Sequence, residues 1–173
     1  MAGQSHVTSI QDLHRMLSKC DKCWRVTMNG RLIKSYNELP HIHLKNHSQN
    51  YSIIVNTLAT DDVEKVGHWY NISVYNGQFA VICDGLNKIK QSPKVWNATK
   101  SFCRKNGLKF HYFTARYQLK SSDLCGYLAC FFVSHCHSST LRGLMSFKKL
   151  LNNNSIKTNE MYVLNRVKHH LSL

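Results

Sequence analysis

The sequence predicts an α+β fold in which helices pack against a mixed central β-sheet. Apolar runs of strand length lie in the middle of the chain, and segments with helical periodicity lie towards both ends. Asn76-Gly77 joins two of the strand-like runs, as the turn of a β-hairpin does. With 173 residues, of which 43% are hydrophobic, we expect a single domain over residues 1–173.

The first half of the chain predicts one helix followed by strands. Ser9 can cap a helix over residues 10–20, because Ile10, Leu13, Met16 and Leu17 then share one face. The segment after this helix has no clear pattern. Strands are expected over residues 51–56, 68–75 and 78–84, the last two forming the hairpin.

The second half predicts mainly helices. Pro93 suits the first position of a helix that ends at Gly107, and a strand over residues 109–114 follows. Further helices are expected over residues 125–137 and 140–151, and a last one is capped near Thr158. On the last helix, the spacing of apolar residues predicts one apolar face, made by Met161, Leu164, Val167 and Leu171. The basic residues of this helix are expected to be exposed, and they are Arg166, Lys168, His169 and His170.

The chain is strongly basic. Its 23 lysines and arginines against 9 acidic residues give a net charge of +14. A solvated basic surface is one explanation, but this charge exceeds what solubility requires. We therefore expect nucleic acid, DNA in particular, as a partner bound through phosphate contacts. The basic side chains are distributed over the middle and last helical segments, at Lys88, Lys90, Lys94, Lys100, Arg104, Lys105, Lys109, Arg142, Lys148, Lys149, Arg166 and Lys168.

The cysteines and the N-terminal sequence predict an intracellular protein. The cysteine count of 7 is odd, and most of them lie in apolar segments, unlike a secreted disulfide framework. The N-terminal residues do not resemble a signal peptide, and no run approaches 18 apolar residues. We expect a monomer in the cytosol or nucleus, neither secreted nor bound to a membrane.

A zinc site is the alternative use of some of these cysteines. Cys20 and Cys23, with His41, His43 and His47 downstream, offer thiolate and imidazole ligands. The histidine spacing is loose, which favours surface histidines and no metal. Another group of thiols falls at apolar helical positions typical of a core, at Cys103, Cys130 and Cys136.

Cys125 is the candidate nucleophile. It stands where a loop turns into an apolar helix, and unpaired N–H groups at a helix start favour the thiolate. Alone, such a cysteine would more often be structural. A base is available at His68, and the hairpin brings it beside Asp84, which can fix the imidazole tautomer.

These residues carry a resemblance to a known family. His68-Trp69, then Asp84, Gln118 and Cys125-Gly126 follow an order that resembles the CE clan of cysteine proteases, which includes adenain and the SUMO- and NEDD8-specific proteases. The spacing of Gln118 and Cys125 is closer to adenain, the adenovirus maturation protease. The resemblance implies a papain-like fold with its elements in circularly rearranged order.

The resemblance also implies roles and a function. Cys125 is the nucleophile, His68 the base, and Asp84 orients the base. Gln118 donates to the oxyanion, and Trp69 walls the site so that small residues, often glycine, precede the scissile bond. The chain would be a viral endopeptidase that cleaves precursor proteins during virion maturation, in the virion and the host nucleus. The resemblance implies chemistry that requires no cofactor, and it makes DNA or a peptide a candidate activator.

Two other functions stay open at this point. A protease of the same fold that removes ubiquitin or SUMO would suit the same narrow cleft, because these modifiers end in Gly-Gly. A nucleic-acid-binding or structural protein with an inactive protease fold is the alternative from another class. The complete set of His68, Asp84, Gln118 and Cys125 argues against this second alternative.

Overall fold

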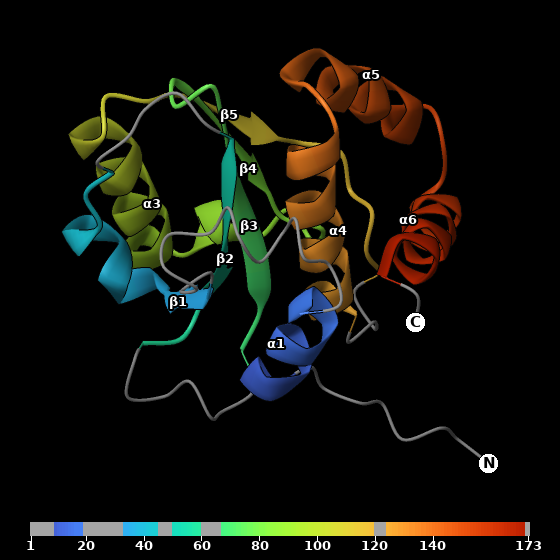
Figure 1. The fold of residues 1–173 in the computed structure, drawn as a ribbon, viewed down its shortest axis with the longest axis horizontal. Coiled ribbons are helices and arrows are strands. Elements are labelled where there is room, and N and C mark those ends of the chain that lie inside the picture. The colour runs from blue at the N-terminus through green and yellow to red at the C-terminus, as the bar shows by residue number, and fades with distance from the viewer. Residues whose placement is uncertain (1–8, 19–32, 45–49, 60–66, 120–123, 172–173) are drawn as a thin grey trace.

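The computed structural model describes residues 9–18, 33–44, 50–59, 67–119 and 124–171. Over these ranges it is an α+β structure with helices on both faces of a mixed sheet (Figure 1), so the predicted class is confirmed. None of the described helices is long and apolar enough to span a membrane.

The strands of the sheet pair in the order in which they occur along the chain. The two outer pairs, β1 with β2 and β4 with β5, are parallel, and the inner pairs are antiparallel. β2 and β3 are buried along their whole length, which explains their nearly continuous apolar character. The bounds are β1 Ile33–Ser35, β2 Tyr51–Asn56, β3 Trp69–Tyr75, β4 Phe79–Cys83 and β5 Lys109–Phe113.

A tight turn sets the register of the β3–β4 hairpin. Asn76 and Gly77 both have positive φ, 55° and 62°, and the N–H of Gln78 donates to the carbonyl oxygen of Tyr75 over 3.1 Å. This left-handed pair matches the natural twist of the two strands and confirms the predicted hairpin. At the other end of the hairpin, His68 immediately precedes β3 and Asp84 immediately follows β4.

One face of the sheet is covered by α3 (Pro93–Lys105), with the short helix η2 (Tyr36–His41) beside it (Figure 1). Pro93 occupies the start of α3, and Gly107, at a φ of 64°, follows its end, both as predicted. Neither β1 nor η2 was predicted. A strand of 3 residues is too short to show an alternating pattern.

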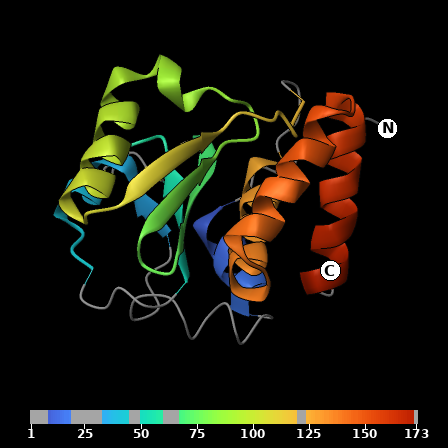
Figure 2. The ribbon, with the colours of Figure 1, turned by 90° about the horizontal axis from the view of Figure 1, so that it is seen from above.

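The other face is covered by α4 (Cys125–Ser138), which lies directly on β2 and β3. Helix α1 (Ile10–Ser18) packs beside it, and Ser9 caps α1 by accepting from the N–H of Asp12 over 3.1 Å, as predicted. Helix α6 (Ile156–Leu171) packs against α4 farther from the sheet, after α5 (Leu141–Asn152) has reversed the chain (Figure 2).

A small polar cluster is buried in the sheet on the α4 side. Asn71 donates to the hydroxyl oxygen of Ser52 over 2.6 Å, and the hydroxyl of Ser73 donates to the side-chain oxygen of Asn71 over 2.6 Å. All three residues are at most 2% exposed. Because the members pair with one another, their burial leaves these groups satisfied.

The buried face of α6 differs from the prediction. Met161, expected in the core, is 58% exposed, whereas Val163 is fully buried at 0%. Beside Val163, the polar side chains of Asn159 and Glu160 are buried at 2% and 8% exposure. Leu164 packs against the core as expected, so the apolar spacing was wrong at Met161, and part of the buried face is polar. The side chains of Val167 and Leu171 lie outside the described residues.

Candidate active site

Cys125 is the first residue of α4 and is partly exposed. The other described cysteines are buried, and burial raises the pKa of each thiol above its ordinary value. These are Cys83, Cys103, Cys130 and Cys136, and they are neutral core thiols. Among the described cysteines, therefore, Cys125 is the one with solvent access and a helix start, as the sequence predicted.

His68 is fixed by its backbone at the entrance to β3. Its N–H donates to the hydroxyl oxygen of Thr57 over 3.0 Å, and the N–H of Thr57 donates to the His68 carbonyl oxygen over 2.9 Å. Thr57 directly follows β2, the partner strand of β3, so the two strand ends hold the histidine between them. Its side chain is 16% exposed, which leaves one edge of the ring accessible.

Asp84 receives the imidazole and is itself held by backbone donors. The distance from His68 Nε2 to Asp84 Oδ1 is 2.5 Å. The N–H groups of Lys88 and Ile89 donate to Oδ2 over 2.5 and 2.9 Å, and the N–H of Leu86 donates to Oδ1 over 3.1 Å. The side chain is 0% exposed, so these donors replace the water that a carboxylate would otherwise bind.

The protonation of the pair follows from these contacts. Burial by itself lowers the pKa of His68, but hydrogen bonds to Asp84 and Cys125 and the charges of both raise it to about 9. Burial raises the pKa of Asp84, yet the hydrogen bond and charge of His68 and the backbone donors bring it below its ordinary value. Asp84 is thus a carboxylate and His68 an imidazolium at neutral pH. Because Asp84 takes Nε2, ring atom Nδ1 is left for the Cys125 thiol.

This protonation predicts an alkaline limit to activity. We expect kcat/KM for peptide cleavage to fall as the pH rises through about 9, where His68 loses its proton. The same proton stabilises the fold fully below pH 6.5, the ordinary pKa, and this contribution is lost as the pH rises through about 9. A pH profile of kcat/KM checks the limit, and an alkaline limb near pH 6.5 would contradict it.

Gln118 lies beside the residue that follows Asp84. The N–H groups of Tyr117 and Gln118 donate to the carbonyl oxygen of Gly85 over 3.3 and 3.1 Å. A Cβ at position 85 would lie 2.9 Å from Cβ and 3.0 Å from Oε1 of Gln118, so only glycine permits this approach. The structure therefore brings Gln118 to the Asp84 end of the site, at 1% exposure.

Trp69 follows His68 and packs into the core between the sheet and α4. It is 4% exposed and belongs to the apolar cluster against which Cys125 also packs. Trp69 and Cys125 thus contact the same apolar cluster. The role of Trp69 in shaping a substrate cleft stays a prediction, because little of its surface reaches solvent.

Several residues of this site were not predicted. Thr57 accepts from the His68 N–H through its hydroxyl oxygen, and Gly85 acts through its backbone. The hydroxyl of Tyr112 donates to Asp84 Oδ2 over 3.4 Å. Glu160 accepts from the N–H of Leu119 over 3.0 Å. The rarity of acidic residues in the second half of the sequence could have drawn attention to Glu160, because only Asp123 and Glu160 are acidic after Asp84.

The zinc alternative finds no support among the described residues. No group of three His, Cys, Asp or Glu side chains in these ranges could hold a metal ion. His41 and His43 are exposed there, whereas Cys20, Cys23 and His47 lie outside the described residues. The segment Trp24–Gly30, between α1 and β1, also lies outside the described residues.

No family model matches the chain, and no curated protein matches it either.

Proposed function

We propose that this chain is a cysteine endopeptidase in which Cys125, His68 and Asp84 form the catalytic triad. One observation carries the proposal: His68 Nε2 lies 2.5 Å from the buried Asp84 carboxylate, and the partly exposed Cys125 thiol at the start of a helix is close enough to raise the pKa of His68. A purely structural ion pair has no need of the thiol. A purely structural cysteine has no need of a charged histidine, and the other described cysteines lie buried.

The reaction follows from the charges. The Cys125 thiolate attacks the peptide carbonyl carbon, and a C–S bond forms as the C–N bond breaks. The His68 imidazolium gives its proton to the departing amine, which yields a thioester and a free amine. His68 then takes a proton from water as the resulting hydroxide attacks the thioester carbon. The C–S bond breaks, the carboxylic acid product departs, and Cys125 is released as the thiolate beside the reprotonated imidazolium. Asp84 stabilises the imidazolium throughout and remains ionised.

The negative oxygen that forms in both steps needs donors. The backbone N–H of Cys125 is in the first turn of α4, where helix geometry supplies no intrahelical acceptor. The side-chain amide of Gln118 is the second donor in our proposal. Together they form an oxyanion hole, in which removal of a single donor costs about 100-fold or more in kcat.

For the substrate we propose precursor polypeptides with a small residue, glycine above all, before the scissile bond. The resemblance to adenain supports this choice, as does the bulk of Trp69 beside the histidine. We propose a role in virion maturation, and hence in the virion and the host nucleus, as the same resemblance implies.

The test is covalent capture of the nucleophile by a substrate-like electrophile. We expect a peptide ending in a Gly-Gly vinyl sulfone to add once per chain, at Cys125, and mass spectrometry of the digested adduct locates it. Because the other described cysteines are buried, a Cys20→Ser/Cys23→Ser background removes the remaining competitors. Absence of an adduct on Cys125, or equal labelling of the unfolded chain, would refute the proposal. Faster capture by ubiquitin or SUMO vinyl sulfone would identify a modifier protease instead.

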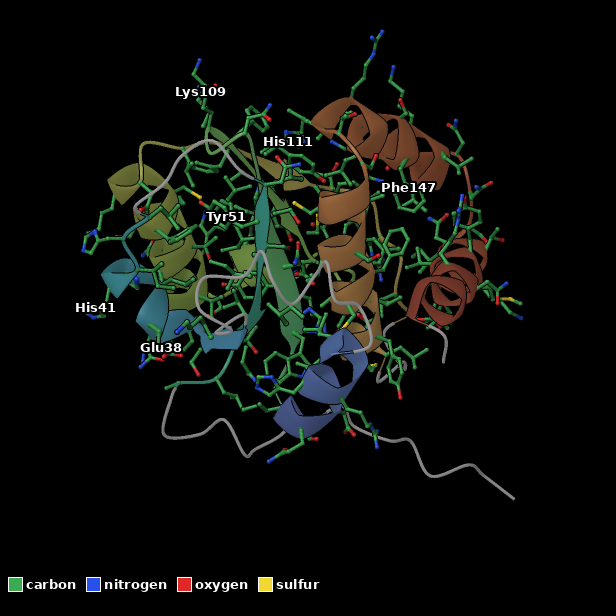
Figure 3. The ribbon with its side chains drawn as sticks, viewed as in Figure 1. Glu38, His41, Tyr51, Lys109, His111 and Phe147 are labelled. Carbon is green, nitrogen blue, oxygen red and sulfur yellow. The ribbon has the colours of Figure 1, made fainter. Side chains whose placement is uncertain are left out.

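A basic surface beside β5 supports a second function, the binding of DNA. The Lys90 ammonium lies 5.2 Å from the ring centroid of Trp96 and 4.6 Å from that of Tyr112, and Lys100 lies 5.8 Å from Trp96. On the other side of the strand, Lys148 Nζ is 2.6 Å from His111 Nε2. Figure 3 shows Lys109, an exposed residue, extending away from the molecule at the start of the same strand.

The lysines at this surface act on the imidazole of His111. Burial, and then the charges of Lys148 and Lys90, lower the pKa of His111 below its ordinary value. A duplex phosphate placed here would neutralise cations that now repel one another. The partly exposed ring of Trp96, which has Lys90 and Lys100 beside it, also suits stacking on an exposed base.

We expect the logarithm of the DNA affinity to fall linearly with the logarithm of the salt concentration. Lys90→Gln and Lys100→Gln should each reduce the slope by about 1, because each removes one phosphate contact. Fluorescence anisotropy with a labelled duplex measures this. Lys157→Gln, on exposed α6 surface, is the control that should leave the slope unchanged. An affinity independent of salt would exclude binding of this kind.

A further inference from the structure

Two polar residues of α6, Asn159 and Glu160, are hydrogen-bonded to the short segment Arg116–Leu119. The Asn159 side-chain amide donates to the Arg116 carbonyl oxygen over 3.0 Å and to the Leu151 carbonyl oxygen over 2.8 Å. The Glu160 carboxylate accepts from the N–H of Leu119 over 3.0 Å. Asn159 and Glu160 thus hold the two ends of this segment.

The middle of the segment is held from the opposite side. Gly85 accepts from the N–H groups of Tyr117 and Gln118. Consequently each residue from Arg116 to Leu119 has a backbone group hydrogen-bonded either to α6 or to Gly85. This segment contains Gln118, and it leads to the nucleophile at Cys125.

The carboxylate at position 160 has a local partner. It accepts from a backbone N–H that an apolar side chain of similar size would leave without this acceptor. The described residues contain Asp12, Glu38, Asp84 and Glu160 as acids, and each accepts a hydrogen bond from a backbone N–H. For Glu160 that N–H belongs to the residue after Gln118.

We propose that Glu160, assisted by Asn159, is a positioning residue for the oxyanion hole: it fixes the Gln118 segment so that the Gln118 amide is held for the developing negative charge. This inference rests on the proposed protease function. Glu160 does not touch the reacting atoms and acts through Gln118.

A double-mutant cycle tests the inference in the full chain. Glu160→Met keeps the length of the side chain and removes the acceptor. We expect it to lower kcat about 10- to 100-fold with little change in KM, because an oxyanion donor is felt mainly in the transition state. In a Gln118→Ala background the same change should lower kcat less than about 3-fold, since its target is already absent. Glu160→Gln retains an acceptor and should restore most of kcat.

Two measurements separate positioning from damage to the fold. Iodoacetamide alkylation of Cys125 depends on His68 and needs no oxyanion hole, so its rate should stay the same in Glu160→Met. Asn165→Ala, at an exposed position of α6, is the matched control and should retain wild-type kcat.

The outcomes distinguish the inference from the function on which it rests. Equal losses of kcat in the two backgrounds, an unchanged kcat in Glu160→Met, or a parallel loss of alkylation would overturn the positioning role while leaving the protease intact. A wild-type protein that alkylates at Cys125 but cleaves no Gly-Gly peptide would overturn the protease function itself.

Discussion

Replacement of Cys125 by alanine should abolish peptide cleavage, with a loss in kcat on the order of 10⁶-fold. The thiolate forms the bond to the carbonyl carbon, and alanine offers no atom that can replace it. The fold should tolerate the change, because Cys125 is partly exposed at the helix start and alanine favours helices. A chromogenic Gly-Gly peptide measures cleavage, and thermal unfolding measures stability.

Cys103→Ala is the matched control for this prediction. It also removes a thiol, but from the core beneath α3, where Cys103 is 0% exposed. We expect it to lower the melting temperature through the cavity it leaves and to retain kcat. If the two variants cleaved at similar rates, Cys125 would not be the nucleophile.

Asparagine in place of Asp84 should lower kcat about 10⁴-fold, because it imposes the wrong histidine tautomer. The Oδ2 atom accepts from the N–H groups of Lys88 and Ile89, so the asparagine oxygen must take that place. Its NH₂ group then faces His68 Nε2, which has to become an acceptor. The ring proton moves to Nδ1, and the nitrogen that faces the thiol can no longer accept the thiol proton.

The rate at which iodoacetamide alkylates Cys125 at neutral pH measures this change directly. In Asp84→Asn the thiolate loses its imidazolium partner, and the rate should fall together with kcat. Asn97→Ala, at an exposed position of α3, provides the control. A variant with normal alkylation and normal kcat would show that Asp84 serves the fold alone.

The hairpin explains why the acid and base could be predicted from sequence. Asn76-Gly77 is a local signal for one turn type, and a turn fixes the pairing of the strands that it joins. The placement of His68 beside Asp84 followed from it and is confirmed. Cys125 at a helix start was readable for a similar reason, since polar loop residues change there to an apolar run.

The contacts between distant segments were not predictable in this way. Glu160 is buried where it accepts from the backbone N–H of Leu119. A contact with a backbone group cannot be predicted from hydrophobic periodicity, which depends on side chains alone. Periodicity instead selected Met161, which the structure leaves 58% exposed. The need for glycine at position 85 has the same origin, because it comes from the approach of Gln118, 33 residues later in the chain.

The left-handed turn at Asn76 and Gly77 has a consequence at the far end of its hairpin. A slip of one residue between β3 and β4 would move every β4 side chain to the opposite face of the sheet. Asp84 would then turn away from His68. Substitutions at the turn, remote from every reacting atom, should therefore create a misregistered population in which His68 has lost the carboxylate that orients it and stabilises its positive charge.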